Sequence, residues 1–346
     1  MGPDFALDNA QEAIVRLAGE VLGDHGDAPR QLWKSLGQAG LLGLAVPVEL
    51  GGAGLGALAT GLLLTEIGRH AARVPAWSTL SLGVLPLVRW GSAEQQRDLL
   101  PGVLEGRVLT AALGEPVAAT EDWRLTGTCH AVPDADRAHR ILVPARGTVA
   151  LVDPSASGVT LLRTPASSGT DEFTLLLEDV AAEPLGRIEG RFQRYAMAGA
   201  CALGDGALAG ALRMTADHVR DRRQFGRPLA TFQAVAQQIA DVYIASRTMH
   251  LAALAANWRL DQDQGRDHDY GTDADADADL WTGAFWLGSE VLPALRVCHH
   301  LHGGLGLVAD HPLHRHTELV RDLVRHLGGA EHCLDRWGDS GVHRAD

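Results

Sequence analysis

Residues 222–233 read Arg-Arg-Gln-Phe-Gly-Arg-Pro-Leu-Ala-Thr-Phe-Gln, and this stretch decides the fold of the chain. Gly226 permits a sharp change of chain direction because glycine tolerates conformations that other residues avoid. Apolar residues recur at helical spacing before the stretch, over Tyr195–Arg220, and again after it, over Phe232–Leu260. The stretch therefore predicts a tight connection between two long helices.

The same helical spacing returns twice more, over Trp281–His302 and His314–His326. The four segments together predict a C-terminal four-helix bundle within residues 188–346. The acidic tract 261–280, DQDQGRDHDYGTDADADADL, interrupts them. Its alternating Asp and Ala offer no apolar face and its charges repel one another, so we expect a disordered surface loop. Calcium binding is the alternative, but the tract lacks the spaced glycine and distal glutamate of an EF-hand loop.

Residues 108–187 have a different pattern, in which short apolar or β-branched runs are separated by Gly, Pro, Ser and Asp. Such runs predict a small antiparallel β domain. The expected strands are Arg140–Val143, Thr148–Val152, Val159–Leu162 and Phe173–Leu177. Because these strands are consecutive, the order of elements favours an α+β chain over a doubly wound sheet.

Residues 1–107 are expected to form an N-terminal helical domain. Apolar residues have helical spacing over Leu7–Val21, Gln31–Leu42 and Leu58–Arg69. A loop rich in proline and glycine lies at 46–54, and Ser92-Ala-Glu-Gln95 has the pattern of a capping box that opens a further helix.

The overall composition is that of a globular protein, with 46% hydrophobic and 21% charged residues. A net charge of -13 argues against binding to nucleic acid, which requires a concentrated basic surface. We expect no membrane span, because no apolar stretch reaches about 20 residues, and no signal peptide. The four cysteines form no CxxC pair, which favours reduced thiols and a cytoplasmic location.

Three segments taken together resemble the acyl-CoA dehydrogenase family. Val46–Gly54 is similar to the family's N-terminal "vPeeyGGxG" loop, and residues 222–233 are similar to "RxxFGxxxxxxQ". His302-Gly-Gly-Leu-Gly306, followed by Pro312, is similar to "QxxGGxG…P". Each segment alone is weak, but their order and separations make the set specific. The resemblance runs nearly end to end and implies an acyl-CoA dehydrogenase-like α+β fold.

In this family an FAD lies across a subunit interface. The β domain of one subunit holds the ring system, and the C-terminal helices of its neighbour hold the adenosine diphosphate end. By resemblance, the residues of this chain at the diphosphate end are Arg222, Phe225, Gln233, His300, Gly303 and Gly304.

The chemistry of these residues suits that role. The guanidinium of Arg222 can fork onto a diphosphate, and Phe225 can offer an aromatic face. Gln233 combines a donor and an acceptor, and the Gly303-Gly304 pair lets backbone amides approach a ligand closely. Taken singly, each residue has an ordinary alternative: a surface arginine, a core phenylalanine, a helix-cap glutamine and a loop glycine pair.

Two family signatures of the β domain are altered. The "TEP" turn becomes Gly114-Glu115-Pro116, which loses the threonine hydroxyl. The "WxTxA" stretch beside the flavin ring is replaced by residues 125–134, LTGTCHAVPD, without the expected tryptophan. The β region is also shorter than the family pattern, so we do not expect the β domain of this chain to hold a flavin ring of its own.

The family's catalytic base is altered as well. A carboxylate must remove the proton alpha to the thioester while hydride leaves the beta carbon for the flavin. Counting without gaps, the usual glutamate becomes Leu327, before Gly328, and the arginine nine positions earlier becomes Glu318. At the alternative position, on the helix before the turn, the nearest residues are Gln193 and Arg194, neither of which can accept the proton.

Other residues are candidates for a base, a metal ligand or a contact with the flavin. Glu331 is the alternative for a relocated base, although its segment reads as an exposed terminus, and Glu189 is a weaker one. A zinc site is disfavoured because the histidines near the glycine pair include no helical HxxxH with a third ligand. His300 stands where the family often has glutamine, so a hydrogen bond to the adenosine end of the flavin is the better interpretation.

Shortened acyl-CoA dehydrogenases of actinobacterial type pair unlike subunits into heterotetramers with fewer flavins than subunits, and this chain resembles such a subunit. The hypothesis is a partner that binds one end of an FAD whose ring and base come from a second subunit. The complex would desaturate an acyl-CoA, for instance a steroid side-chain thioester, and pass electrons to a separate acceptor. The alternatives are a self-sufficient dehydrogenase that uses Glu331 and a scaffold without enzymatic activity.

Overall fold

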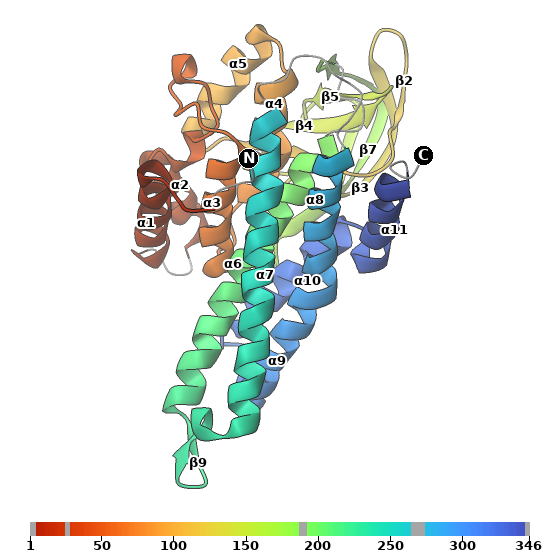
Figure 1. Cartoon of the computed structure of the whole chain (residues 1–346). Coiled ribbons are helices and arrows are strands. Elements are labelled where there is room, and N and C mark those ends of the chain that lie inside the picture. Colours follow the sequence, from red (N-terminus) through yellow and green to blue (C-terminus); the bar gives the residue numbers. More distant parts are fainter. Residues whose placement is uncertain (1–4, 25–27, 187–191, 264–273, 343–346) are drawn as a thin grey trace.

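The structure is a computed structural model that describes residues 5–24, 28–186, 192–263 and 274–342. Helices at the N-terminal end, two small sheets in the middle and long helices at the C-terminal end confirm the predicted α+β class (Figure 1).

The N-terminal helices pack against the bundle through α3 (Ala57–Arg69), which is buried on nearly every side. Its glycines allow this closeness, since a Cβ at Gly68 would lie 2.1 Å from the carbonyl oxygen of Leu203. The predicted capping box is present at the start of α5 (Ala93–Leu104), where Ser92 and Gln95 bond each other's backbone N–H groups. The other elements here are α1 (Asn9–Asp24), α2 (Pro29–Gln38), η1 (Leu41–Gly43), η2 (Val48–Leu50), the π-helical η3 (Trp77–Val84) and α4 (Leu85–Trp90).

The middle region forms two four-stranded sheets, ordered β1-β4-β5-β8 and β2-β3-β7-β6. All pairings within them are antiparallel, as expected, except that of β1 with β4, which is parallel and was not expected. β1 follows the N-terminal helices and enters the sheet beside a strand that is distant in sequence. The strands are β1 (Val108–Ala111), β2 (Ala118–Ala119), β3 (Arg124–Pro133), β4 (Ala138–Ala145), β5 (Thr148–Val152), β6 (Val159–Pro165), β7 (Asp171–Ala181) and β8 (Glu183–Pro184).

The C-terminal region contains the four predicted helical segments and one helix that was not predicted. The third segment begins earlier than expected and is a single helical run with a π-helical turn, η5 (Leu287–Val291), inside it. The unpredicted helix is α11 (Gly329–Val342), which was expected to be an exposed terminal segment. The other helices are α6 (Phe192–Asp221), α7 (Gln233–Asp263), α8 (Ala274–Trp286), α9 (Leu292–His302) and α10 (Leu313–His326).

The acidic tract is not loop throughout, which corrects the expectation for residues 261–280. Its first residues end α7 and its last residues begin α8, while 264–273 lie outside the described residues. Asp277 forms a two-bond ion pair with the almost fully buried Arg194, at 2.8 and 3.0 Å. Asp279 pairs with Arg259 on α7 at 2.6 Å. The aspartates therefore have packing partners, on helices too distant in sequence for composition to reveal.

The long helix α6 lies at the centre of the hydrophobic core. The apolar part of α6 is long enough to cross a membrane, but 89% of that window is buried inside the protein. Contacts with α3, α7, α8, α9 and α10 surround it. This burial is the pattern of a core helix.

The far ends of α6 and α7 extend beyond the body as an arm (Figure 1). A two-residue hairpin joins them, with β9 (Arg223–Gln224) paired to β10 (Arg227–Pro228). Phe225 and Gly226 form its tip at φ values of 52° and 80°. Two successive positive φ values are the geometry of a type I′ hairpin turn, which confirms the tight connection predicted around Gly226.

Candidate functional site

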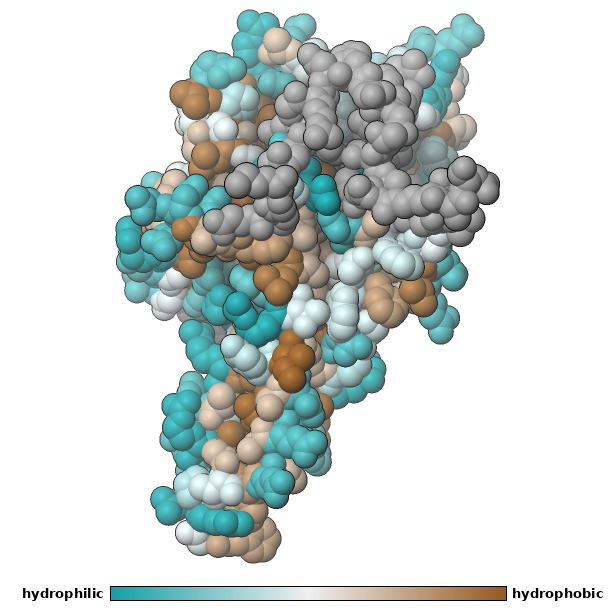
Figure 2. Space-filling view, viewed as in Figure 1, coloured by the Kyte–Doolittle hydropathy of each residue, from teal (hydrophilic) through white to brown (hydrophobic). Residues whose placement is uncertain are grey.

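The tip of the arm presents polar and aromatic side chains to solvent. Arg222, Phe225 and Gln233 are all exposed, and Phe225 is 92% exposed. The ring of Phe225 lies edge-on to Phe232 at 6.2 Å, and the guanidinium of Arg227 covers Phe232 at 4.0 Å. Hydrophilic and apolar residues lie side by side at this end of the molecule (Figure 2). An aromatic ring held so far from its own core is suited to contact with something outside the chain.

The glycine pair follows the end of α9 and is also exposed. Gly303 has φ 59° and ψ -140°, a conformation that is essentially restricted to glycine. At Gly304 the backbone is helical and a Cβ would meet nothing within 4 Å, so packing within the chain does not require glycine there. Close approach of a ligand to the backbone would account for it.

A stack of imidazoles brings the arm and the glycine turn together. His218 on α6 stacks on His302 at 4.5 Å, and His302 meets His311 edge-on at 4.9 Å. Arg222 lies one helical turn after His218, to whose carbonyl its N–H is bonded, and His302 directly precedes the glycine pair. The stack thus joins two segments that lie about 80 residues apart in sequence.

Burial lowers the pKa of His218, His302 and His311, and the charge of Arg222 lowers the pKa of His218 further, while a hydrogen bond to the carbonyl of Cys298 acts in the opposite direction at His302. These imidazoles are therefore neutral at pH 7. His300 lies in the last turn of α9 and is exposed. Among the described ranges, no three His, Cys, Asp or Glu side chains are placed to hold a metal ion.

A cleft of about 490 Å³ lies between the start of α6, the loop after β1, and the junction of α10 with α11. The residues that line it include the positions of the altered turn and of the missing base. Gly114 and Glu115 of the altered turn line it, as do Gln193, Leu327 and Gly328. The floor is apolar, and the rim carries exposed polar side chains.

Within the described residues, none of the candidate base positions places a carboxylate in this cleft, although the side chain of Glu115 lines its rim. Leu327 is buried and apolar, and Gln193 is an amide on the rim. Glu318 is turned to Arg73, at 3.6 Å. Glu331 is exposed in the first turn of α11 and is not among the residues that line the cleft. Glu189 lies outside the described residues.

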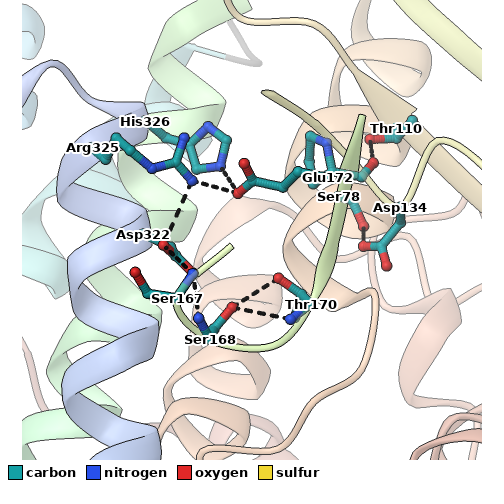
Figure 3. A network of polar contacts seen from close by, with 11 residues as sticks. Ser78, Thr110, Asp134, Ser167, Ser168, Thr170, Glu172, Asp322, Arg325 and His326 are labelled. Carbon is teal, nitrogen blue, oxygen red and sulfur yellow. Dashed lines mark hydrogen bonds and ion pairs between the residues drawn. The ribbon is translucent and has the colours of Figure 1, made fainter. Parts of the chain in front are cut away.

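A buried polar network lies behind the cleft (Figure 3), and its residues were not predicted from the sequence. Glu172 on β7 accepts hydrogen bonds from Arg325 at 2.6 Å and from Nε2 of His326 at 2.8 Å. Both oxygens of Asp322 accept backbone N–H groups, from Ser167 and Ser168. The network fastens the last turns of α10 to the β6–β7 connection. No local pattern identifies Glu172, because its partners lie about 150 residues away.

An inner cavity lies on the other side of this network. Its volume is about 70 Å³, enough for two or three water molecules and too small for an acyl group. Burial raises the pKa of Asp134 on its wall, although a hydrogen bond from Ser78 and the charge of Arg137 act in the opposite direction.

Comparison with known proteins accounts for this arrangement. Residues 4–107 match the N-terminal domain of acyl-CoA dehydrogenases, and residues 191–334 match the C-terminal domain. The acyl-CoA dehydrogenase FadE28 of Mycobacterium tuberculosis is 45% identical, over 97% of this chain and 98% of that protein.

Two solved structures have the same fold. The Tcur3481-Tcur3483 steroid ACAD, as its G363A variant, matches with a TM-score of 0.88 and 35% identity, over 97% of this chain and 98% of that one. The ChsE4-ChsE5 complex from Mycobacterium tuberculosis matches with a TM-score of 0.88 and 30% identity, over 99% of this chain and 100% of that one. The chain therefore belongs to the acyl-CoA dehydrogenase family.

Proposed function

We propose that this chain is one subunit of a heteromeric, FAD-dependent acyl-CoA dehydrogenase, in which it binds the adenosine diphosphate end of the flavin and does not supply the catalytic base. The observation that carries the proposal is the contrast between two places in one chain. The arm presents polar and aromatic groups that suit the diphosphate end of a dinucleotide, while the family's two base positions in the cleft carry Leu327 and Gln193 in place of a carboxylate.

The arm fits the diphosphate end of FAD. Arg222 is exposed and can donate two hydrogen bonds to a diphosphate, and Phe225 offers an uncovered aromatic face. Gly304 leaves open space against its backbone, so amide groups there are accessible to a ligand. Gln233 and His300 are both exposed and offer further hydrogen-bonding groups.

The cleft fits the flavin ring less well. Gly114 offers no side-chain hydroxyl where the family turn has threonine, and Leu327 cannot accept a proton. When bound, the flavin supplies the acceptor for a hydride. The residues of this chain hold and orient one end of that cofactor, and proton removal falls to a carboxylate of another subunit.

The comparisons support a partner and suggest a substrate class. Two of the similar structures carry paired names, Tcur3481-Tcur3483 and ChsE4-ChsE5, and the second is described as a complex. The first is described as a steroid ACAD, so the substrate proposed here is a bulky CoA thioester of the steroid side-chain type. Electrons would leave the flavin for a separate carrier, and a cytoplasmic location suits this chemistry.

Expression of the chain alone, and together with a candidate dehydrogenase-like chain from a neighbouring gene, tests the proposal. We expect bound flavin and thioester-dependent dye reduction only when both chains are present. A lone homo-oligomer with one flavin per chain and full activity would overturn it.

A further inference from the structure

A second cleft, here called the N-terminal cleft, lies where α1, α2 and α3 lie beside one another (Figure 1). Its volume is about 590 Å³, within the usual range for a small-molecule site. It is lined by the end of α1, the start of α2, the connection after α3 and one residue of α10, and it shares no lining residue with the cleft beside Leu327. Residues 25–27, between α1 and α2, lie outside the described residues and form no part of this site.

The ionisable side chains that line the described part of the N-terminal cleft are all basic. They are His70, Arg73 and Arg315, in a chain whose net charge is -13. A concave surface with charge of one sign concentrates the field and attracts ions of the opposite sign. The remaining lining residues are apolar or glycine, and among them Leu22 and Leu32 are buried. The cleft therefore combines basic groups with an apolar wall.

The guanidinium of Arg73 has donors to spare. Its side chain is 39% exposed, and it makes no hydrogen bond to another residue in the described ranges. The carboxylate nearest to it belongs to Glu318, at 3.6 Å, and an exposed pair at that separation contributes little. A guanidinium carries five N–H donors in a fork that matches an oxyanion. Arg73 is thus able to bind an anion that enters the cleft.

The backbone holds Arg73 in place. The N–H groups of Ala71 and Ala72 bond the carbonyls of Gly68 and Ile67, at 2.9 and 3.1 Å, which closes the end of α3 as a Schellman motif. Ala71 has a φ of 45°, at the position where such motifs usually have glycine. Strained backbone of this kind is found at ligand clamps. It fixes the direction in which the chain leaves α3, so little ordering of the backbone is needed when an anion binds.

Two further groups complete the basic wall. Nδ1 of His70 lies 3.0 Å from the carbonyl oxygen of Glu66, which can only accept, so Nδ1 carries a proton. Nε2 is then an acceptor in the neutral ring and a donor in the charged ring. Arg315 lies on α10 and, like Arg73, lines both the N-terminal cleft and the inner cavity. Its charge adds to that of Arg73 on the same wall.

We propose that the N-terminal cleft binds a phosphate monoester with a small apolar body. Such a phosphate carries a charge of about -1.5 to -2 at pH 7 and three acceptor oxygens, which suits two arginines and an imidazole better than a carboxylate does. The phosphate accepts hydrogen bonds from Arg73 and lies within the field of Arg315 and His70, while the apolar body lies against Leu22 and Leu32. The site is separate from the arm and does not depend on the proposed function.

Calorimetric titration of the full-length chain tests this site with four probes. Phenyl phosphate has both the charge and the apolar body, inorganic phosphate has the charge alone, benzyl alcohol has the body alone, and benzoate replaces phosphate by carboxylate. We expect phenyl phosphate to bind one site per chain, inorganic phosphate and benzoate to bind about tenfold more weakly, and benzyl alcohol to give no saturable heat. Absence of saturable binding of phenyl phosphate, or tighter binding of benzoate, would overturn the proposal.

Variants of opposite effect assign the binding to this cleft. Arg73→Gln should weaken the binding of phenyl phosphate about tenfold or more, because it removes a charged donor. Glu318→Gln should strengthen it, because it removes the carboxylate that competes for Arg73. Gly23→Trp should block the cleft without disturbing α1, since Gly23 is exposed and a Cβ there would meet nothing within 4 Å.

Arg222→Ala is the matched control, because it removes an exposed arginine from the arm and leaves the N-terminal cleft intact. Its titration should equal that of the wild type, and circular dichroism should show that every variant is folded. Equal affinity in the wild type, Arg73→Gln and Gly23→Trp would indicate an adventitious ion only and would overturn the proposal. Loss of binding in Arg222→Ala would place the phosphate on the arm and would overturn it as well.

Discussion

At the scale of single residues, Arg222 connects the arm to flavin binding most directly. A charge-assisted, two-pronged hydrogen bond to a diphosphate contributes about 1.5–3 kcal/mol. We therefore expect Arg222→Ala to weaken flavin binding by the assembled complex roughly tenfold or more. Flavin absorbance after gel filtration measures the occupancy.

Arg163→Ala is a suitable control, since Arg163 is an exposed arginine on β6, away from the arm, paired with Asp171. Its complex should retain the flavin of the wild type. Full occupancy in the Arg222→Ala complex would favour the scaffold alternative.

His316 on α10 should make stability depend on pH. Burial lowers its pKa from 6.5 to about 4. The unfolded chain therefore binds a proton more readily than the folded one, and the stability that His316 contributes is complete above pH 6.5 and is lost as the pH falls toward 4. At pH 5 the loss amounts to about 2 kcal/mol.

Urea unfolding at pH 7.5 and pH 5 measures this loss. The His316→Asn variant should show a smaller fall between the two pH values than the wild type. His130→Gln, at an exposed histidine of β3, should retain the dependence of the wild type. An unchanged dependence in His316→Asn would contradict the assignment.

Single residues also mark the limit of prediction from sequence. The sharp turn at Gly226 and the capping box at Ser92 could be predicted because their geometry depends on neighbours a few positions away. Glu172 and His326 could not, because each acquires its role from a partner more than 150 positions distant. The ungapped spacing from Gly303 placed the family's base position at Leu327. The local sequence does not indicate that the adjacent histidine is held by a buried carboxylate.

At the scale of elements, the acidic tract shows why composition can mislead. Alternating Asp and Ala has no apolar stripe, and an isolated segment of this kind would have no reason to fold. The start of α8 is helical beside the buried Arg194, whose guanidinium is bonded by Asp277. Tertiary ion pairing therefore overrides the local preference.

Removal of this carboxylate should destabilise the helical bundle. Asp277→Ala withdraws both hydrogen bonds from an arginine that is itself almost fully buried. We expect a loss of about 1–3 kcal/mol in the free energy of unfolding, measured with urea. Asp241→Ala, at an exposed position of α7, should change it by less than about 0.5 kcal/mol. Equal stabilities of the two variants would show that the pair contributes nothing.

At the scale of the whole molecule, the order of helical, β and helical regions followed from the change of apolar spacing along the chain. The parallel pairing of β1 with β4 and the helix α11 did not, because both depend on packing between distant segments. The imidazole stack that joins the arm to the glycine turn is of the same kind. The exact limits of the three regions, at 107 and 187, remain predictions.

The central claim is that the chain shares a flavin but provides no catalytic carboxylate. Rapid mixing of the oxidised complex with a thioester substrate, followed by the loss of flavin absorbance, isolates the chemical step. With Glu331→Gln in this chain we expect the rate of flavin reduction to be unchanged, since Glu331 is exposed and outside the cleft. A fall of about 10²–10⁴-fold, the usual contribution of a general base, would contradict the claim.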